Sequence, residues 1–190
     1  MTDDEAFALH CKSLTNCGRD PLKGGYLHIN VGTNARLTEF QAAILRAQLG
    51  RLEEQTRIRE ENGNWLNGAL DGIEGILPQP GDPRITRRAY HLYCMRIDPL
   101  HFGCSREKFI EAANAEGLPV GGGYPMPLYK QPVLAREERY AGVCCPVCED
   151  LCDRSAMWFR HGLLLGSRED MQDIVDIVRK IKDNAGALSG

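Results

Sequence analysis

The chain has 190 residues, of which 43% are hydrophobic and 26% charged, and its formal net charge is −3 at pH 7. This is the composition of an ordinary globular protein, which excludes a disordered, collagen-like or coiled-coil chain. The acidic balance provides no basic surface for nucleic acid, and no stretch approaches the ~20 apolar residues of a membrane span, so neither partner is expected. Residues 1–6 are acidic and polar, unlike a secretory signal, and predict a cytoplasmic protein.

The first predicted element is a short helix over residues 3–16. Its first turn is acidic, which suits the helix dipole, and Phe7, Leu9 and Leu14 are its apolar positions. Residues 18–32 follow as a glycine-punctuated loop.

A long helix is the clearest predicted element. From residue 38 to about 70 there is no proline, and apolar residues recur at helical spacing. Thr38 and Gln41 form a capping-box pattern at its start. We expect one helix, or two joined near Gly50, with the first half deeply buried and the second half buried along one side.

The remaining sequence alternates between strand and helix patterns. Residues 76–83 are extended and broken by prolines, and the expected elements after them are a strand over 89–97, a helix from the cap Ser105 to about 116, a strand over 118–120 that runs into three glycines, a proline-rich loop over 124–132, a cysteine-bearing helix over 148–157, a strand over 162–166 and a helix over 168–184. This order predicts one compact α/β or α+β unit over about residues 80–190.

Four of the eight cysteines lie close together, at Cys144, Cys145, Cys148 and Cys152. Cys145 and Cys148 have the spacing of a zinc-knuckle half-site or a redox pair, but a structural zinc site needs four ligands, and the other cysteines are scattered. Cys148 and Cys152 are neighbours on one face of the expected helix, as buried small residues would be. We therefore favour buried or incidental thiols and predict no metal site.

One segment carries a family signature. Residues 32–44 read Gly-Thr-Asn-Ala-Arg-Leu-Thr-Glu-Phe-Gln-Ala-Ala-Ile, and Gln48-Leu49 follow. This closely resembles the G-x-N-x-R…E-x-Q-A-A…Q-L signature of the DegT/DnrJ/StrS-type sugar and aminocyclitol aminotransferases. The similarity continues through further motifs in family order, at residues 90–93, 116–120, 123–129 and 163–166 with the helix after them.

The resemblance implies the carboxy-terminal part of a pyridoxal-phosphate-dependent transferase of fold type I. In that family a large domain holds the cofactor on a lysine, a small domain closes over the substrate, and two subunits complete each other's sites. For this chain it implies that residues 1–75 are the tail of the large domain with a long interdomain helix, and that residues 76–190 are the small α+β domain. A homodimer is also implied.

Site residues follow from the same resemblance. The family asparagine typically reaches the cofactor phosphate of the neighbouring subunit, which makes Asn34 a cofactor-binding candidate together with Gly32 and Arg36 of its motif. The alternative for Asn34 is a loop residue that caps the helix beginning near Thr38, and for Arg36 a structural role, in an ion pair or in fixing the loop, is favoured. His91 matches a position that faces the active site in several members and is a substrate-binding candidate, with a histidine on a buried strand as the alternative. Tyr124 is a substrate-binding candidate, with a packing aromatic as the alternative.

No catalytic residue is assigned. The family's Schiff-base lysine precedes a segment similar to residues 1–5, and none of the six lysines has its glycine- and serine-flanked setting. The family reaction moves an amino group from glutamate or glutamine to a keto-sugar or keto-cyclitol, and we expect the isolated chain neither to bind the cofactor covalently nor to transaminate. Two alternatives stay open: a partner subunit that acts in trans with a separate large domain, and a non-catalytic module that binds zinc through Cys145 and Cys148.

Overall fold

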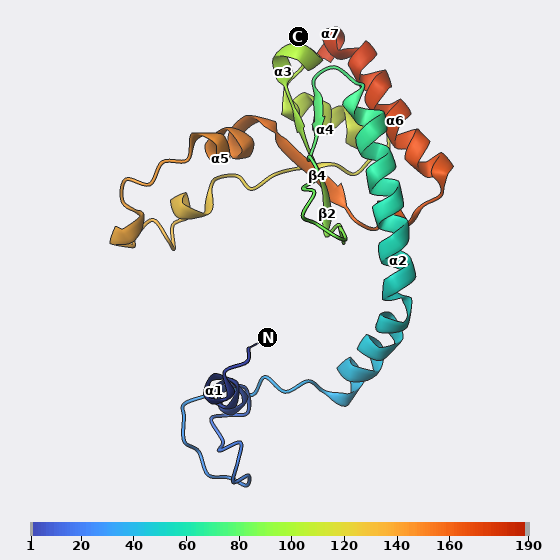
Figure 1. Ribbon diagram of the computed structural model, residues 1–190. Coiled ribbons are helices and arrows are strands. Elements are labelled where there is room, and N and C mark those ends of the chain that lie inside the picture. Colours follow the sequence, from blue (N-terminus) through green and yellow to red (C-terminus); the bar gives the residue numbers. More distant parts are fainter. Residues whose placement is uncertain (1, 189–190) are drawn as a thin grey trace. The chain divides into compact units, whose positions relative to one another are not determined.

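The computed structural model describes residues 2–188 and divides into two compact units between Leu52 and Glu53 (Figure 1). Helix α2 (Glu39–Asp71) contributes residues to both units and is a single helix, without a break at Gly50. Within residues 2–188, no helix is long and apolar enough to cross a membrane.

The amino-terminal unit consists of α1 (Glu5–Thr15), a loop and the first part of α2. The carboxylate of Asp4 caps α1 by accepting a hydrogen bond from the backbone N–H of Phe7 at 3.0 Å. The predicted capping box at the start of α2 is confirmed, because Gln41 N–H donates to the Thr38 hydroxyl at 3.2 Å and the Gln41 side chain accepts from Thr38 N–H at 3.0 Å.

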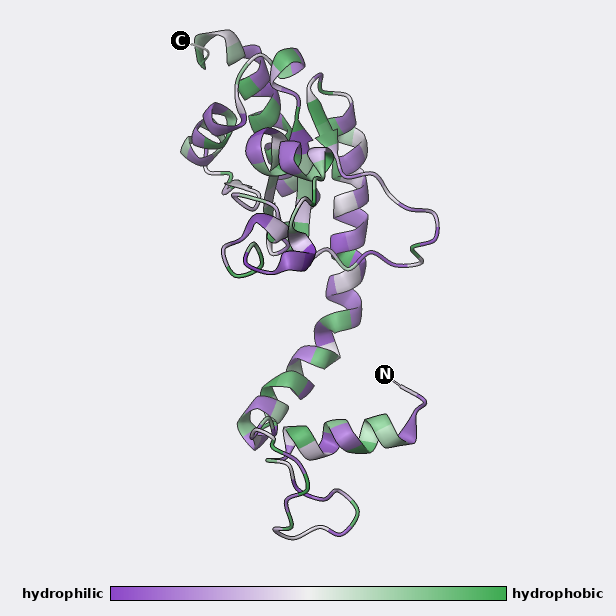
Figure 2. Cartoon of the chain, turned by 90° about the vertical axis from the view of Figure 1, so that its left-hand side faces the viewer, coloured by the Kyte–Doolittle hydropathy of each residue, from purple (hydrophilic) through white to green (hydrophobic). Residues whose placement is uncertain are grey.

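No hydrophobic side chain is buried within residues 2–52. The expectation that the first half of α2 is deeply buried is therefore wrong for this chain: Phe40 is 85% exposed and Leu49 is 68% exposed. Figure 2 shows hydrophobic residues all along this half. Periodicity identifies apolar positions on a helix but does not show what covers them.

The carboxy-terminal unit is built on a four-stranded antiparallel sheet with strand order β1-β2-β4-β3. The strands are β1 (Ile76–Pro78), β2 (Leu92–Ile97), β3 (Gly121–Gly122) and β4 (Ala156–Arg160). Burial alternates along β2 and β4, as it does in a sheet with one packed face. Tyr93 stacks on Phe159 within this face, with ring centroids 4.7 Å apart.

Helices supply the rest of the core, which includes fully buried Leu66 of α2, Phe109 of α4 and Val178 of α6. The helices of this unit other than α2 are α3 (Pro99–Phe102), α4 (Arg106–Ala115), α5 (Pro146–Asp150), α6 (Arg168–Asp183) and α7 (Ala185–Leu188). A π-helical turn, Leu151–Ser155, continues α5, and short 3₁₀ turns lie at Leu128–Lys130, Glu138–Tyr140 and Leu163–Leu165. The predicted helices after Ser105 and Ser167 are confirmed, and Ser167 forms a capping box with Asp170.

Three predicted elements differ from the structure. Residues 156–160 form the strand β4, although the cysteine pattern predicted a helix to 157, because the alternating burial from Ala156 to Arg160 is that of a strand. Residues 162–166 form a 3₁₀ turn instead of a strand. The segment 118–120 turns through a bond from Val120 N–H to the Leu118 carbonyl, so the glycines after it carry the strand pairing.

The division of the structure places residues 53–75 with the sheet, since Leu66 and Leu70 pack into its core. The assignment of residues 1–75 and 76–190 to a large and a small domain stays a prediction.

Candidate functional site

Close backbone contacts position the loop that carries Asn34. A Cβ atom on Gly32 would lie 2.5 Å from the backbone nitrogen of Gly18 and 2.5 Å from the carbonyl oxygen of Leu14, so only glycine fits there. Strand-like hydrogen bonds then fix the segment against the end of α1, from Thr33 N–H to Leu14 O and from Ala35 N–H to Thr15 O, both at 2.9 Å. Gly32 therefore has a structural role in holding Asn34 in place.

Arg36 orients the side chain of Asn34. Its Nε–H donates to Asn34 Oδ1 at 3.0 Å, and its backbone N–H donates to the same oxygen at 3.4 Å. With Oδ1 engaged, the Nδ2 amide of Asn34 and the terminal nitrogens of Arg36 have no partner among the described residues. Both groups donate hydrogen bonds and one is cationic, so this exposed pair has the chemistry of a phosphate-binding site.

The two remaining candidates from the sequence lie in the carboxy-terminal unit. His91 is exposed and immediately precedes β2, so the alternative of a histidine on a buried strand is wrong. Tyr124 is 60% exposed, and its ring meets the ring of Trp158 edge-on at 5.9 Å. It follows that Tyr124 is only partly used in packing and presents most of its surface outward.

His91 belongs to a group of basic side chains that the sequence did not reveal. Its ring lies 6.2 Å from the ring of His161, which follows β4 directly. Burial, then the positive charges of Arg59 and its neighbours, lower the pKa of His161 below the usual range. The pairing of these strand ends could not be predicted, because the sequence pattern assigned a helix where β4 begins.

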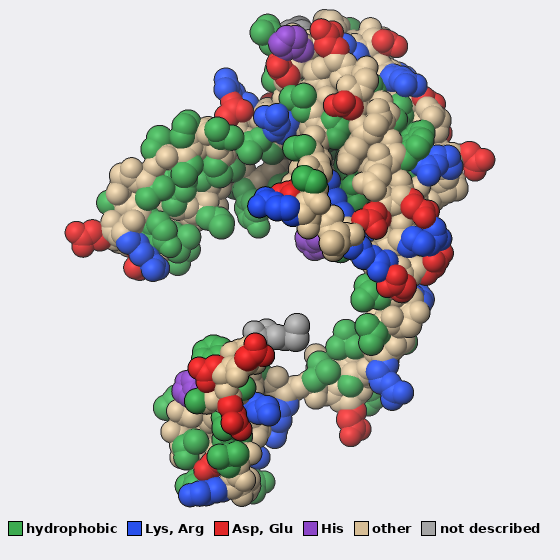
Figure 3. Space-filling view, viewed as in Figure 1, with side chains coloured by type: hydrophobic (Ala, Val, Ile, Leu, Met, Phe, Trp, Pro, Cys, Tyr) green, Lys and Arg blue, Asp and Glu red, His purple; other side chains and the backbone are tan. Residues whose placement is uncertain are grey.

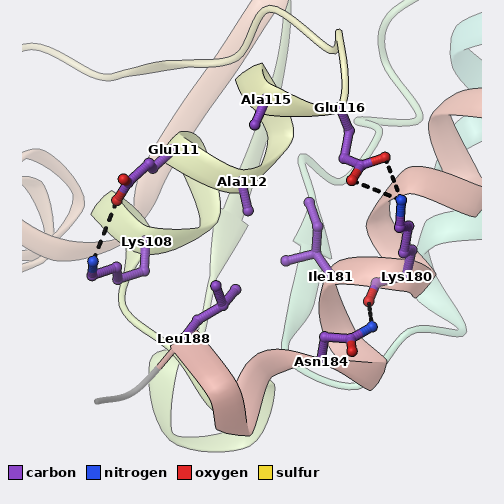
Figure 4. Close-up of a pocket in the computed structure, with 9 residues that line it drawn as sticks. All are labelled: Lys108, Glu111, Ala112, Ala115, Glu116, Lys180, Ile181, Asn184 and Leu188. Atoms are coloured by element: carbon purple, nitrogen blue, oxygen red, sulfur yellow. Dashed lines mark hydrogen bonds and ion pairs between the residues drawn. The ribbon is translucent and has the colours of Figure 1, made fainter.

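A surface pocket of about 440 Å³ lies between α4 and the α6–α7 segment (Figure 4). Its charged side chains are paired: Lys180 binds Glu116 at 2.7 Å, and Lys108 binds Glu111 at 3.3 Å. Because those charges are already neutralised, the pocket offers no free charged group to a ligand.

The clustered cysteines do not form a metal centre in the part of the chain described. No group of three or more His, Cys, Asp or Glu residues within 2–188 is arranged to hold a metal ion. Cys144, Cys145 and Cys148 are exposed and Cys152 is half-buried. Cys148 is therefore not the buried small residue that its spacing from Cys152 indicated, whereas the alternative of incidental thiols stays a prediction.

The pattern of the DegT/DnrJ/EryC1/StrS aminotransferase family matches residues 1–179. The chain belongs to this family. Members of the family depend on pyridoxal phosphate, as the resemblance of the motifs implied.

Two curated relatives illustrate the similarity. The L-glutamine:2-deoxy-scyllo-inosose aminotransferase of Micromonospora echinospora is 35% identical over 172 residues, which cover 84% of this chain and 40% of the relative. The 3-amino-5-hydroxybenzoate synthase of Amycolatopsis mediterranei is 30% identical over 169 residues, which cover 86% of this chain and 43% of the relative.

The solved structure of a 3-amino-5-hydroxybenzoic acid synthase superposes with a TM-score of 0.79 at 27% identity, over 95% of this chain and 48% of that chain. This likeness confirms the predicted fold class, a part of the fold of pyridoxal-phosphate-dependent aminotransferases. The chain spans about half the length of the relatives it matches.

Proposed function

We propose that this chain is the carboxy-terminal portion of a pyridoxal-phosphate-dependent aminotransferase that moves an amino group from glutamine to a keto-cyclitol. The observation that carries the proposal is the family match over residues 1–179, together with relatives that use glutamine and a scyllo-inosose ketone. The sequence alone also left glutamate open as the amino donor and a keto-sugar open as the acceptor. The relatives favour glutamine and a keto-cyclitol. We also propose a homodimer, as the family resemblance implies.

The exposed apolar surface of the amino-terminal unit supports a role within a larger assembly (Figure 3). In α2, Phe40 and Ile44 lie on one stripe, whereas Leu45, Leu49 and Leu52 lie on another roughly 130° away around the helix. All five are more than half exposed. A helix that is apolar on two sides is normally buried on both, and each such side chain gains roughly 1.5–3 kcal/mol on burial.

The Leu45 stripe lines a groove of about 440 Å³ within the amino-terminal unit. Its walls are almost entirely aliphatic, with Leu37, Leu49 and Leu52 among the lining residues. An open groove of this composition fits the apolar surface of another protein domain and not a polar sugar. A large domain of the same polypeptide, or a separately encoded one that acts in trans, would satisfy it.

Asn34 and Arg36 would hold the cofactor through its phosphate. Arg36 keeps the Asn34 carbonyl oxygen engaged at 3.0 Å, which leaves the Nδ2 amide to donate a hydrogen bond to a phosphate oxygen. Bound there, pyridoxal phosphate would supply the electron sink that amino transfer requires. The contribution of this chain is then to fix the position of the phosphate.

We further propose that no lysine of this chain attaches the cofactor covalently. Four of the six lysines form ion pairs with carboxylates: Lys108 with Glu111, Lys130 with Glu149, Lys180 with Glu116 and Lys182 with Glu74, at 2.7–3.3 Å. These amino groups are held by carboxylates, whereas a lysine that attaches a cofactor needs a free, desolvated amine. The other two, Lys12 and Lys23, are exposed and lack the desolvation that activates a catalytic lysine.

Covalent attachment is tested on the full chain with pyridoxal phosphate and borohydride. We expect no lysine to be labelled stoichiometrically, and a single lysine labelled at one equivalent would contradict this part of the proposal.

Amino transfer is tested by co-expression with the amino-terminal half of the Micromonospora echinospora relative. The expected complex retains pyridoxal phosphate and converts 2-deoxy-scyllo-inosose in a reaction that depends on L-glutamine. Asn34→Ala should weaken cofactor retention at least tenfold, whereas Asn184→Ala, far along the sequence on the C-cap of α6, should not. A cofactor-loaded complex that aminates other ketones but no keto-cyclitol would refute the substrate assignment.

A further inference from the structure

Two histidines meet at one end of the sheet in the carboxy-terminal unit. In the β2–β4 ladder Leu92 pairs with Arg160, and Tyr93 pairs with Phe159. Continuing this antiparallel register by one residue places His91 opposite His161, which agrees with the 6.2 Å between their rings. Both histidines lie just beyond the last paired residues, at the end of the face that Tyr93 and Phe159 pack, where His91 is exposed and His161 is half-buried.

The helix that covers this face changes character at the same end. Tyr93 reaches α2 through a hydrogen bond from its hydroxyl to Asn67 Oδ1 at 2.9 Å. Leu70, Leu66, Gly63 and Arg59 follow one another at helical spacing along the buried face of α2. The apolar core therefore ends at basic residues, with Arg59 on the helix and the two histidines just beyond the strand ends, and the charge of Arg59 acts on His161.

Arg59 is buried without a matching anion. Only 9% of its surface is exposed, and its Nε has no hydrogen-bond partner among the described residues. The hydrogen bond that its Nη2 donates to Gln55 Oε1 is long, at 3.4 Å. A buried guanidinium normally has a carboxylate or an equivalent acceptor, because leaving it unpaired is costly.

His161 also has a buried polar atom without a hydrogen-bond partner. Its Nδ1 is buried and has no partner within residues 2–188, and the charges that act on it, from Arg59, His91 and Arg160, are all basic. Within residues 2–188, no ion pair joins Arg59, His91, Arg160 or His161 to a carboxylate. The acidic residues of α2 nearest to Arg59 in sequence are engaged elsewhere, since Glu54 and Glu61 bind the Arg57 side chain and Glu60 accepts from Arg88 N–H.

The backbone next to His91 is held in an unusual conformation. Tyr90 has a φ of +44°, although it is not a glycine, and it is 5% exposed. Its ring packs over Gly63, stacks on Tyr93 at 6.1 Å and lies under the guanidinium of Arg88 at 4.6 Å. These contacts keep Tyr90 in place and so fix the start of β2, where His91 sits.

We propose that Arg59, His91 and His161 form a binding site for a small oxyanion, a carboxylate or a phosphate group. Every polar atom that the cluster leaves without a partner can donate a hydrogen bond, and the summed charge is positive, which suits an acceptor with two or three oxygens. A guanidinium binds such a group through two parallel hydrogen bonds, and Arg160 adds to the positive field. A metal cation or an ammonium ligand would be repelled.

The proposal is tested by histidine NMR on the full chain, titrated with sodium acetate, L-glutamate or inorganic phosphate at constant ionic strength. We expect saturable shifts of the His91 and His161 resonances, while His101, which is bonded to Asp98, serves as the internal control. Saturation by acetate and L-glutamate identifies a carboxylate site, and saturation by phosphate alone identifies a phosphate site. Each supports the proposal; shifts no larger than those of His101 with all three anions overturn it.

Variants separate binding from folding. Arg59→Gln should lower the affinity for the anion at least tenfold, or by about 1.4 kcal/mol. Arg57→Gln changes an arginine on the exposed face of α2, where it pairs with Glu54 and Glu61, and should leave the affinity unchanged. If Arg59→Gln does not fold, as judged by its circular dichroism, His161→Gln provides the same comparison. Equal affinity of the folded variant and the parent chain would overturn the site. Because the readout is binding by this chain, it does not depend on amino transfer.

Discussion

Gly63 is the position where one methyl group should have the largest measurable effect. A Cβ atom there would lie 2.4 Å from Cζ and 2.8 Å from the hydroxyl oxygen of Tyr90. The ring cannot move away freely, because it is stacked on Tyr93 and covered by Arg88. Gly63→Ala should therefore displace Tyr90 or push α2 away from the sheet.

The magnitude follows from a matched pair of variants. Any Gly→Ala change within a helix gains up to about 1 kcal/mol of helix propensity, and Gly68 lies in the same helix with nothing within 4 Å of its added Cβ. Gly68→Ala should therefore be neutral or stabilising. Subtracting its effect from that of Gly63→Ala leaves the cost of overpacking, which is about 1–3 kcal/mol in a tightly packed core.

Thermal and urea unfolding, followed by circular dichroism, measure this difference. An overpacking cost of that size should set the melting temperature of Gly63→Ala about 3–10 °C below that of Gly68→Ala. If both variants were equally stable, Tyr90 would be free to move, and its role in fixing the start of β2 would be refuted. Gly63→Ser is expected to be at least as destabilising as Gly63→Ala.

Three further outcomes are expected. Asn62→Ala should lower the free energy of unfolding by about 1–3 kcal/mol, because the carbonyls of Leu164 and Gly166 lose their donor at 3.0 and 2.9 Å; an unchanged urea midpoint would contradict this. Ser167→Ala should cost about 1 kcal/mol in thermal unfolding by removing the capping box, and no loss would show that the cap is dispensable. Burial and nearby cations lower the pKa of His161 below 6.5, so below that pH the unfolded chain binds this proton more readily than the folded chain. The free energy of unfolding should therefore fall as the pH drops from 6.5 through the folded pKa, and His161→Gln should make it depend less steeply on pH. An unchanged pH dependence in His161→Gln would contradict this assignment.

Local sequence patterns predicted those elements whose stabilising contacts are local. The helix after Ser167 was predictable because its cap, its acidic first turn and its apolar stripe all lie within the helix itself. β4 was not predictable, because the cysteines before it are spaced as on a helix and its strand character depends on pairing with residues of β2 about 60 to 68 positions earlier. The short 3₁₀ turn around Leu164 depends in the same way on a distant donor, Asn62.

The candidate site residues likewise fall into those identified by a local motif and those that only the fold brings together. Asn34 could be identified from a contiguous motif, and its hydrogen bond with Arg36 joins residues only two apart in sequence. Arg59 and His161 have no motif in common and are separated by about 100 residues, so neither could be linked to His91 without the register of β2 and β4. A buried arginine at an apolar position of a helix is a departure from the core pattern that only a structure can identify as unpaired.

Three departures from local preference coincide at this end of the sheet: a tyrosine with positive φ at Tyr90, a glycine inside a helix at Gly63 and a buried, unpaired guanidinium at Arg59. Each alone destabilises the unit, and strained or unpaired groups persist in folded proteins mainly where binding or catalysis needs them. Gly63 is required so that Tyr90 can pack, and Tyr90 in turn holds the backbone that presents His91 toward His161. Binding of an oxyanion would neutralise the unpaired charge at Arg59, and this gives a physical reason for all three to occur together.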